Sequence, residues 1–103
     1  MHIGWVGGLS RSKVLFSQLA ERSGHSLELH CGDVRGRGGD ELAGIVERCD
    51  LLVIVTELNS HGGMLQAKHF ARRRGRRSVL VRKSSVASLQ RVLSGLGEGA
   101  PSL

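Results

Sequence analysis

The chain has 103 residues, a hydrophobic fraction of 40% and a formal net charge of +6 at pH 7. These values describe one globular domain with a modest core and exclude a disordered chain. No run approaches the roughly 18 apolar residues of a membrane span, and Gly7 and Arg11 interrupt any apolar signal-peptide region. The two cysteines, Cys31 and Cys49, form no CxxC motif, which favours a cytoplasmic protein with both as small core or strand-end residues.

The first third of the chain predicts a strand, a helix and a second strand. Residues 3–6 are apolar and end at Gly7-Gly8, after which Ser10 or Ser12 can cap a helix. Residues 27–31 then alternate apolar and polar side chains. This alternation is typical of an edge strand with one polar face.

The middle of the chain carries its strongest strand signal. After a glycine-rich loop at 32–39, Asp40 is expected to cap a helix that ends near Cys49. Residues 51–55, LLVIV, are apolar throughout, which is typical of a central parallel strand covered on both faces. We expect Val53 and Val55 to be buried on opposite faces of this strand.

The last third predicts one more helix, strand and helix. Asn59 or Ser60 can cap a helix that ends at Gly75, and residues 79–81 form a strand. Ser84 or Ser85 can cap the final helix. The tail, 97–103, is punctuated by glycine and proline and is expected to be flexible.

The alternation of strands and helices predicts one α/β domain over residues 1–96. We expect a three-layer fold with a four-stranded parallel sheet in the order 2-1-3-4, as in flavodoxin-like or half-Rossmann domains. The fourth strand would lie at an open edge, so a homodimer or higher homo-oligomer is expected.

The candidate site lies where the carboxyl ends of the strands meet. Ligands of open α/β sheets bind where the strand order reverses, which is between the first and third strands here. Hydroxyls, backbone N–H groups and cations suit a phosphate or carboxylate. The candidate ligand-binding residues are Gly7, Gly8, Ser10, Arg11, Thr56, Asn59, Ser60, His61, Arg82, Lys83, Ser84 and Ser85.

Other chemistries are less well supported at this edge. The same serines and glycines are typical of helix caps and turns. No GK[ST] follows the glycines and no acidic residue ends the second strand, so neither a Walker A loop nor classical NAD binding is expected. His61 could act as an acid or base, with Glu57 as its partner, and a haem or metal role through His61, His69 or Cys31 stays open. No zinc spacing is present, no catalytic set is complete, and His25 and His30 look peripheral.

The excess positive charge defines the alternative function. Arginines cluster near the end of the third predicted helix, and a basic balance favours anionic partners such as nucleic acid. The chain has few aromatic residues for stacking on bases. The candidate nucleic-acid residues are Arg72, Arg73, Arg74, Arg76 and Arg77, with Arg82-Lys83 able to serve either surface.

Several of these segments together resemble the domain-of-unknown-function 2325 family. The resemblance spans residues 1–96 and lies in Ile3-Gly4-Trp5-Val6-Gly7-Gly8, Asn59-Ser60-His61, Lys68 and Arg82-Lys83-Ser84-Ser85. It implies a small bacterial protein with a Rossmann-like domain, a site at Gly7, Gly8, Ser60, His61, Lys68 and Ser84-Ser85, and no agreed activity. The loop at 34–39 is richer in glycine and arginine than the resemblance implies.

The leading hypothesis is therefore a regulatory or sensor module that binds a small anionic ligand, nucleotide-like or phosphorylated. The alternative is a nucleic-acid-binding protein. A haem, metal or enzymatic role through His61 ranks lower. No cofactor is identified.

Overall fold

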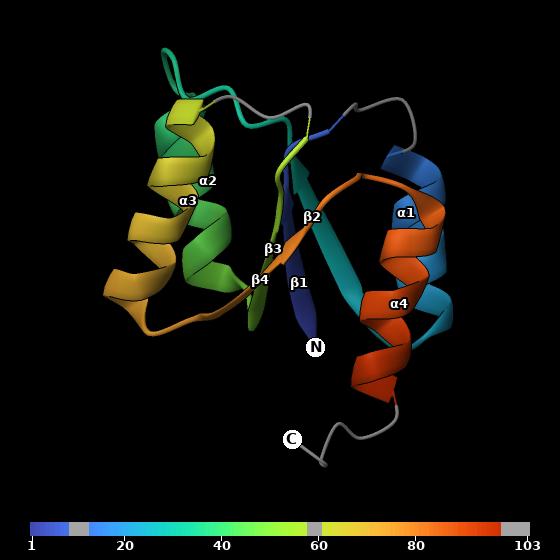
Figure 1. Cartoon of the computed structure of the whole chain (residues 1–103). Helices are drawn as coiled ribbons and strands as arrows, with labels where there is room; N and C mark the ends of the chain where they lie inside the picture. Colours follow the sequence, from blue (N-terminus) through green and yellow to red (C-terminus); the bar gives the residue numbers. More distant parts are fainter. Residues whose placement is uncertain (9–12, 58–60, 98–103) are drawn as a thin grey trace.

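The computed structural model describes residues 1–8, 13–57 and 61–97. The elements in chain order are β1 (His2–Val6), α1 (Lys13–Arg22), β2 (Ser26–His30), α2 (Gly38–Arg48), β3 (Leu51–Val55), α3 (His61–Arg74), β4 (Arg77–Val81) and α4 (Val86–Gly97). The four strands are parallel and follow the order β2-β1-β3-β4, as predicted (Figure 1).

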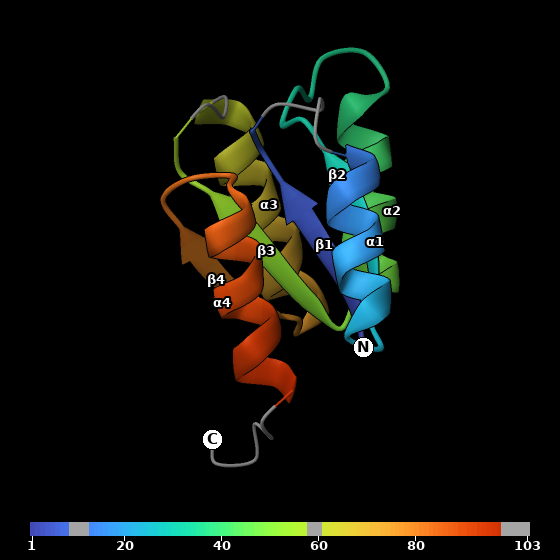
Figure 2. The same ribbon diagram turned by 90° about the vertical axis from the view of Figure 1, so that its right-hand side faces the viewer.

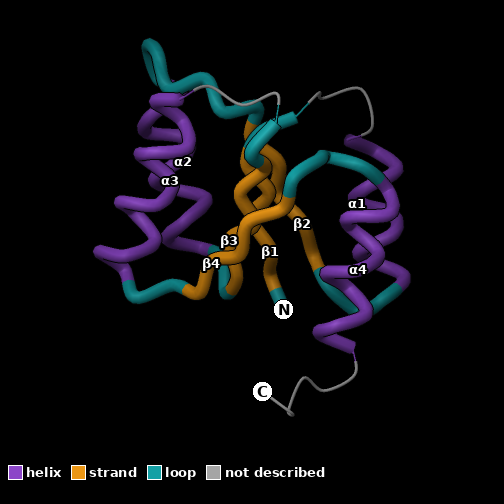
Figure 3. Tube along the Cα trace, in the orientation of Figure 1, coloured by secondary structure: helices purple, strands orange, loops and turns teal. Residues whose placement is uncertain are grey.

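The helices form two layers around this sheet, with α1 and α4 on one face and α2 and α3 on the other (Figures 1 and 2). Right-handed crossovers explain the arrangement, because the chain moves from β1 to β2 in one direction and from β2 to β3 and β4 in the other. The carboxyl ends of the four parallel strands consequently lie at one end of the sheet, away from the N-terminus (Figure 3).

Each face of the sheet has its own hydrophobic core. On the α1/α4 face Trp5 packs with Phe16, Val53 and Val55, whereas Ile54 belongs to the core on the α2/α3 face. Val53 and Val55 are fully buried, as expected. Their expected placement on opposite faces is wrong, because strand residues two positions apart project to the same face.

Two predicted helix caps have different outcomes. Ser85 caps α4, since its Oγ accepts a hydrogen bond from the Ser88 N–H at 3.1 Å. Asp40 does not cap α2: the helix begins earlier, with Arg37 at the N-cap position and no side-chain cap bond. Asp40 and Glu41 instead lie in the first turn, where the helix dipole favours negative charge.

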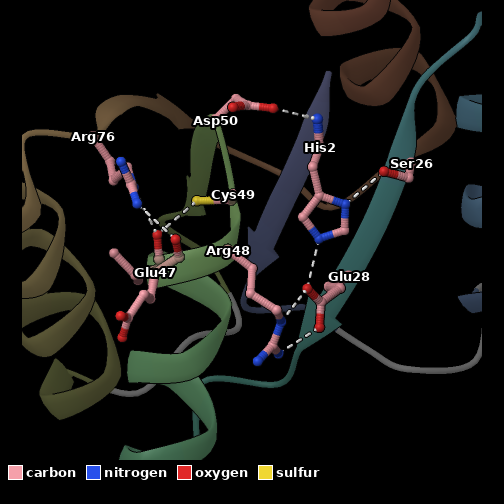
Figure 4. Close-up of polar contacts among 9 residues, drawn as sticks. His2, Ser26, Glu28, Glu47, Arg48, Cys49, Asp50 and Arg76 are labelled. Carbon is pink, nitrogen blue, oxygen red and sulfur yellow. Dashed lines mark hydrogen bonds and ion pairs between the residues drawn. The ribbon is translucent and has the colours of Figure 1, made fainter.

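A polar cluster joins β1, β2 and the end of α2 (Figure 4). His2 Nε2 lies 2.6 Å from Glu28 Oε2, and His2 Nδ1 lies 2.5 Å from Ser26 Oγ. Arg48 donates two hydrogen bonds to the same carboxylate, at 2.7 and 3.0 Å. Asp50 accepts the His2 backbone N–H at 2.8 Å. Chiefly through the hydrogen bond from Arg48, the pKa of Glu28 falls from 4.5 to about 2.

The outer edge of β4 has no neighbouring strand within the described sheet. Leu80, the fourth of the five residues of β4, is 56% exposed. The expected homo-oligomer stays a prediction. None of the described helices is both long and apolar enough to cross a membrane.

Candidate functional site

The first turn of the carboxyl edge is built from two buried glycines. Gly7 and Gly8 follow β1 with φ angles of 105° and 89°, a conformation that side chains disfavour. A Cβ on Gly8 would also lie 2.3 Å from the Cβ of Ser84. The Ser84 hydroxyl accepts a hydrogen bond from Trp5 Nε1–H at 3.1 Å. The first and last loops of the edge are therefore in direct contact, which brings together two of the predicted site residues.

His30 organises the loop that follows β2. Its Nδ1 accepts the Gly32 N–H at 2.9 Å, so the ring proton of the neutral imidazole lies on Nε2, which donates to the Gly38 carbonyl at 2.9 Å. His30 is only 9% exposed, and its own carbonyl accepts the Gly7 N–H at 2.7 Å. The expectation that His30 is peripheral is wrong, because the side chain joins strand end, loop and helix start.

Gly38 allows the loop to close against α2. A Cβ at this position would lie 1.9 Å from the Asp33 carbonyl oxygen. Asp33 also accepts two hydrogen bonds from the Arg35 side chain, each at 3.0 Å. The Arg35 side chain is the main reason that the pKa of Asp33 falls from 3.8 to about 2. The glycine-rich loop at 32–39 is thus a turn held by contacts of His30, Asp33 and Gly38.

We expect Gly38→Ala to destabilise the domain by about 1–3 kcal/mol, the usual cost of overpacking. Gly95→Ala is the matched control, because nothing lies within 4 Å of the new methyl group and alanine favours a helix over glycine by about 1 kcal/mol. Urea unfolding followed by circular dichroism should give opposite signs for the two variants. Equal stabilities would contradict the close approach at Gly38.

These turns line an open cavity of about 490 Å³ beside the carboxyl ends of β1 and β2. Three cationic side chains and two carboxylates line it, together with glycines and the His30 ring. The lining residues are Gly7, Gly8, Lys13, Leu29, His30, Cys31, Asp33, Arg35, Arg37, Gly38 and Glu41. The cavity shares Gly7 and Gly8 with the predicted site, but it extends toward β2, whereas the predicted site extends toward β3.

The loops after β3 and β4 contact each other on the other side of β1. The N–H groups of Thr56 and Glu57 donate to the carbonyls of Val81 and Arg82, at 2.8 and 3.0 Å. Arg82 also donates from Nε to the Glu57 carboxylate at 2.8 Å. Glu57, expected as a partner of His61, is therefore paired with Arg82.

The other predicted site residues are placed as follows. His61 is exposed at the start of α3, Lys68 is exposed on the same helix, and Lys83 is exposed after β4. Ser85 is committed to capping α4. Ser10, Arg11, Asn59 and Ser60 lie outside the described residues.

The arginine run lies at the opposite end of the sheet. Arg72, Arg73 and Arg74 form the last turn of α3. Arg76 donates to the Val46 and Glu47 carbonyls at 3.1 and 2.6 Å, which satisfies the C-terminal end of α2 (Figure 4). Arg76 thus has a structural role that its sequence context did not indicate.

The cysteines and histidines are dispersed over the described chain. Cys49 is buried, and burial raises the pKa of its thiol, whereas Cys31 is exposed just after β2. Among the described residues, no group of three or more His, Cys, Asp or Glu side chains is arranged to hold a metal ion.

A parallel sheet in the order β2-β1-β3-β4, with a cavity at its carboxyl edge, defines an open α/β domain of the Rossmann-like class. The sequence model of a bacterial family, described as "Uncharacterized protein conserved in bacteria (DUF2325)", matches residues 2–96. The chain belongs to this family, as its sequence motifs indicated. No curated protein and no solved structure matches the chain.

Proposed function

We propose that the protein is a small-ligand-binding module, and that it takes an anionic, nucleotide-like or phosphorylated ligand at the carboxyl edge of its sheet. The cavity beside β1 and β2 is the observation that carries this proposal. Its volume of about 490 Å³ lies within the range of small-molecule sites, roughly 300–1,000 Å³.

The charges around the cavity favour an anion. Asp33 is already paired with Arg35, which leaves two cations, Lys13 and Arg37, and one carboxylate, Glu41, as the remaining charged groups of the lining. The amino end of α2 borders the same space, and the helix dipole adds partial positive charge there. A phosphate or carboxylate would therefore be attracted to this side of the cavity.

The remainder of the lining suits the less charged part of such a ligand. Leu29 offers an apolar surface, and the His30 ring is fixed by hydrogen bonds at both nitrogens. Gly7 and Gly8 add backbone atoms to the lining. A nucleotide, with a charged phosphate and a flat, weakly polar base, combines these two requirements.

The test is titration calorimetry of the full chain with AMP, ATP and inorganic phosphate as probes. We expect binding that Arg37→Glu and Lys13→Glu each weaken at least tenfold, because each change reverses a charge that lines the cavity. Arg73→Glu, at the far end of α3, is the matched control and should leave the affinity unchanged. Each variant should retain the wild-type circular dichroism spectrum.

Two results would contradict the proposal. One is no binding of any of the three probes by the wild-type chain. The other is binding of a labelled oligonucleotide, measured by fluorescence anisotropy, that the Arg37→Glu variant retains and the double variant Arg72→Ala, Arg73→Ala loses. The second result would establish the arginine run as the working surface, with the steep salt dependence of phosphate contacts. Arg76 is left unchanged because it caps α2.

A further inference from the structure

A second hollow, distinct from the carboxyl-edge cavity, lies between β4 and α4. This groove has a volume of about 840 Å³. Its apolar lining includes Val79 and Val81 from β4 and Val92 and Leu96 from α4, all of which are only partly buried. The α1/α4 core is therefore incompletely covered at the outer edge of the sheet.

The charged groups along this groove all have one sign. Arg77, Lys83 and Arg91 are exposed, and Arg82 is already paired with Glu57. None of the described residues that line the groove is acidic. A partner with carboxylates at the two ends of β4, near Arg77 and Lys83, would complement the groove electrostatically.

The backbone of β4 can extend the sheet by one strand. The Val81 carbonyl accepts a hydrogen bond from the backbone N–H of Thr56, the residue that follows β3. The backbone groups of Val81 therefore point toward β3. Backbone groups alternate in direction along a strand, which turns those of Leu80 to the open edge. Unpaired groups on an edge strand are a template for another strand.

We propose that this edge docks an extended peptide segment of a partner protein by strand addition. The segment would carry apolar side chains at alternate central positions, over Val79, Val81 and Val92, and Asp or Glu at its flanks. Main-chain hydrogen bonds then supply affinity, and the groove and its cations supply specificity.

Two other occupants fit the groove less well. A second copy that paired antiparallel through β4, with Leu80 opposite Leu80, would place its Arg77 opposite Lys83, and like charges across a strand pair are destabilising. Single-stranded nucleic acid would need aromatic platforms. The groove has none, because the aromatic residues of the chain are Trp5, Phe16 and Phe70.

The experiment begins with selection of binders to the immobilised full chain from a displayed library of random twelve-residue peptides. We expect enrichment of alternating apolar positions flanked by Asp or Glu. The selected peptides are then synthesised with a fluorescent label and titrated by anisotropy. No enrichment, or enrichment of basic peptides, would overturn the proposal.

Charge reversal tests the groove directly. The double change Lys83→Glu, Arg91→Glu should weaken the selected peptide at least tenfold, whereas Arg22→Glu on α1 should not. A peptide with Lys in place of its acidic residues should bind the double variant more tightly than it binds the wild-type protein. Failure of this rescue would overturn the assignment of these cations.

The edge itself is tested at Leu80. Leu80→Pro removes the outward N–H while leaving the β3 side of β4 unchanged, so it should weaken the peptide at least tenfold. Leu80→Ala keeps the N–H and should bind nearly normally. Two results would assign the edge to another occupant and overturn the proposal. One is a dimer, detected by sedimentation, that Leu80→Pro abolishes. The other is an oligonucleotide that binds this groove while no peptide does.

Discussion

Val53→Asp is expected to abolish cooperative folding. Val53 is fully buried in the central strand, where it packs with Trp5 and Phe16 on the α1/α4 face. An unpaired carboxylate at such a position costs about 3–5 kcal/mol in addition to the lost packing, which approaches the whole stability of a small domain, about 5–15 kcal/mol. Circular dichroism should show no cooperative thermal transition.

Leu80→Asp is the matched control, because it introduces the same charge on the adjacent strand at a position that is 56% exposed. This variant should remain folded and melt cooperatively. A Val53→Asp protein that melted as cooperatively as the control would contradict a sheet covered on both faces.

Glu28→Gln is expected to make stability less dependent on pH. The folded-state pKa of Glu28, about 2, lies below the ordinary value of 4.5, so ionised Glu28 stabilises the fold above pH 4.5 and this stabilisation is lost as the pH falls toward 2. A pKa difference of this size corresponds to at most about 3 kcal/mol. The free energy of unfolding of the variant should therefore be lower near pH 7 and approach that of the wild type near pH 2.

The measurement is urea unfolding at a series of pH values between 2 and 7. Glu47→Gln serves as the control, since Glu47 is more exposed and lies 3.6 Å from its partner Arg74. Exposed ion pairs contribute little, so this variant should follow the wild-type pH profile. A Glu28→Gln profile parallel to that of the wild type would show that Arg48 does not stabilise the Glu28 carboxylate.

The strand order could be predicted from the sequence because the strands differ in how apolar they are. The all-apolar stretch LLVIV can bury all its side chains only in a strand that is covered on both faces. The alternating stretch at Ser26–His30 has one polar face and therefore suits an edge strand. Right-handed crossovers then leave few other arrangements. Val53 and Val55 nevertheless share one face, because side chains of a strand alternate with a period of two residues.

The carboxyl-edge cavity was harder to predict because its walls depend on backbone contacts between loops. The approach of Gly38 to the Asp33 carbonyl has no sequence signature beyond the glycine itself. His30 looked like one more polar residue of an edge strand. His30 is the last residue of the strand, and Gly32 follows two residues later. This spacing is the sequence feature that indicates a ring turned back onto the loop.

The hydrogen bond between Trp5 and Ser84 gives the protein an optical reporter of its own. Trp5 is the only tryptophan in the chain, and its ring meets Phe16 edge to face at a centroid distance of 5.4 Å. Indole emission changes colour and intensity when the N–H partner or the surrounding polarity changes. Since that partner touches the Gly8 turn, an event at this turn that moves Ser84 alters the intrinsic fluorescence without any attached dye.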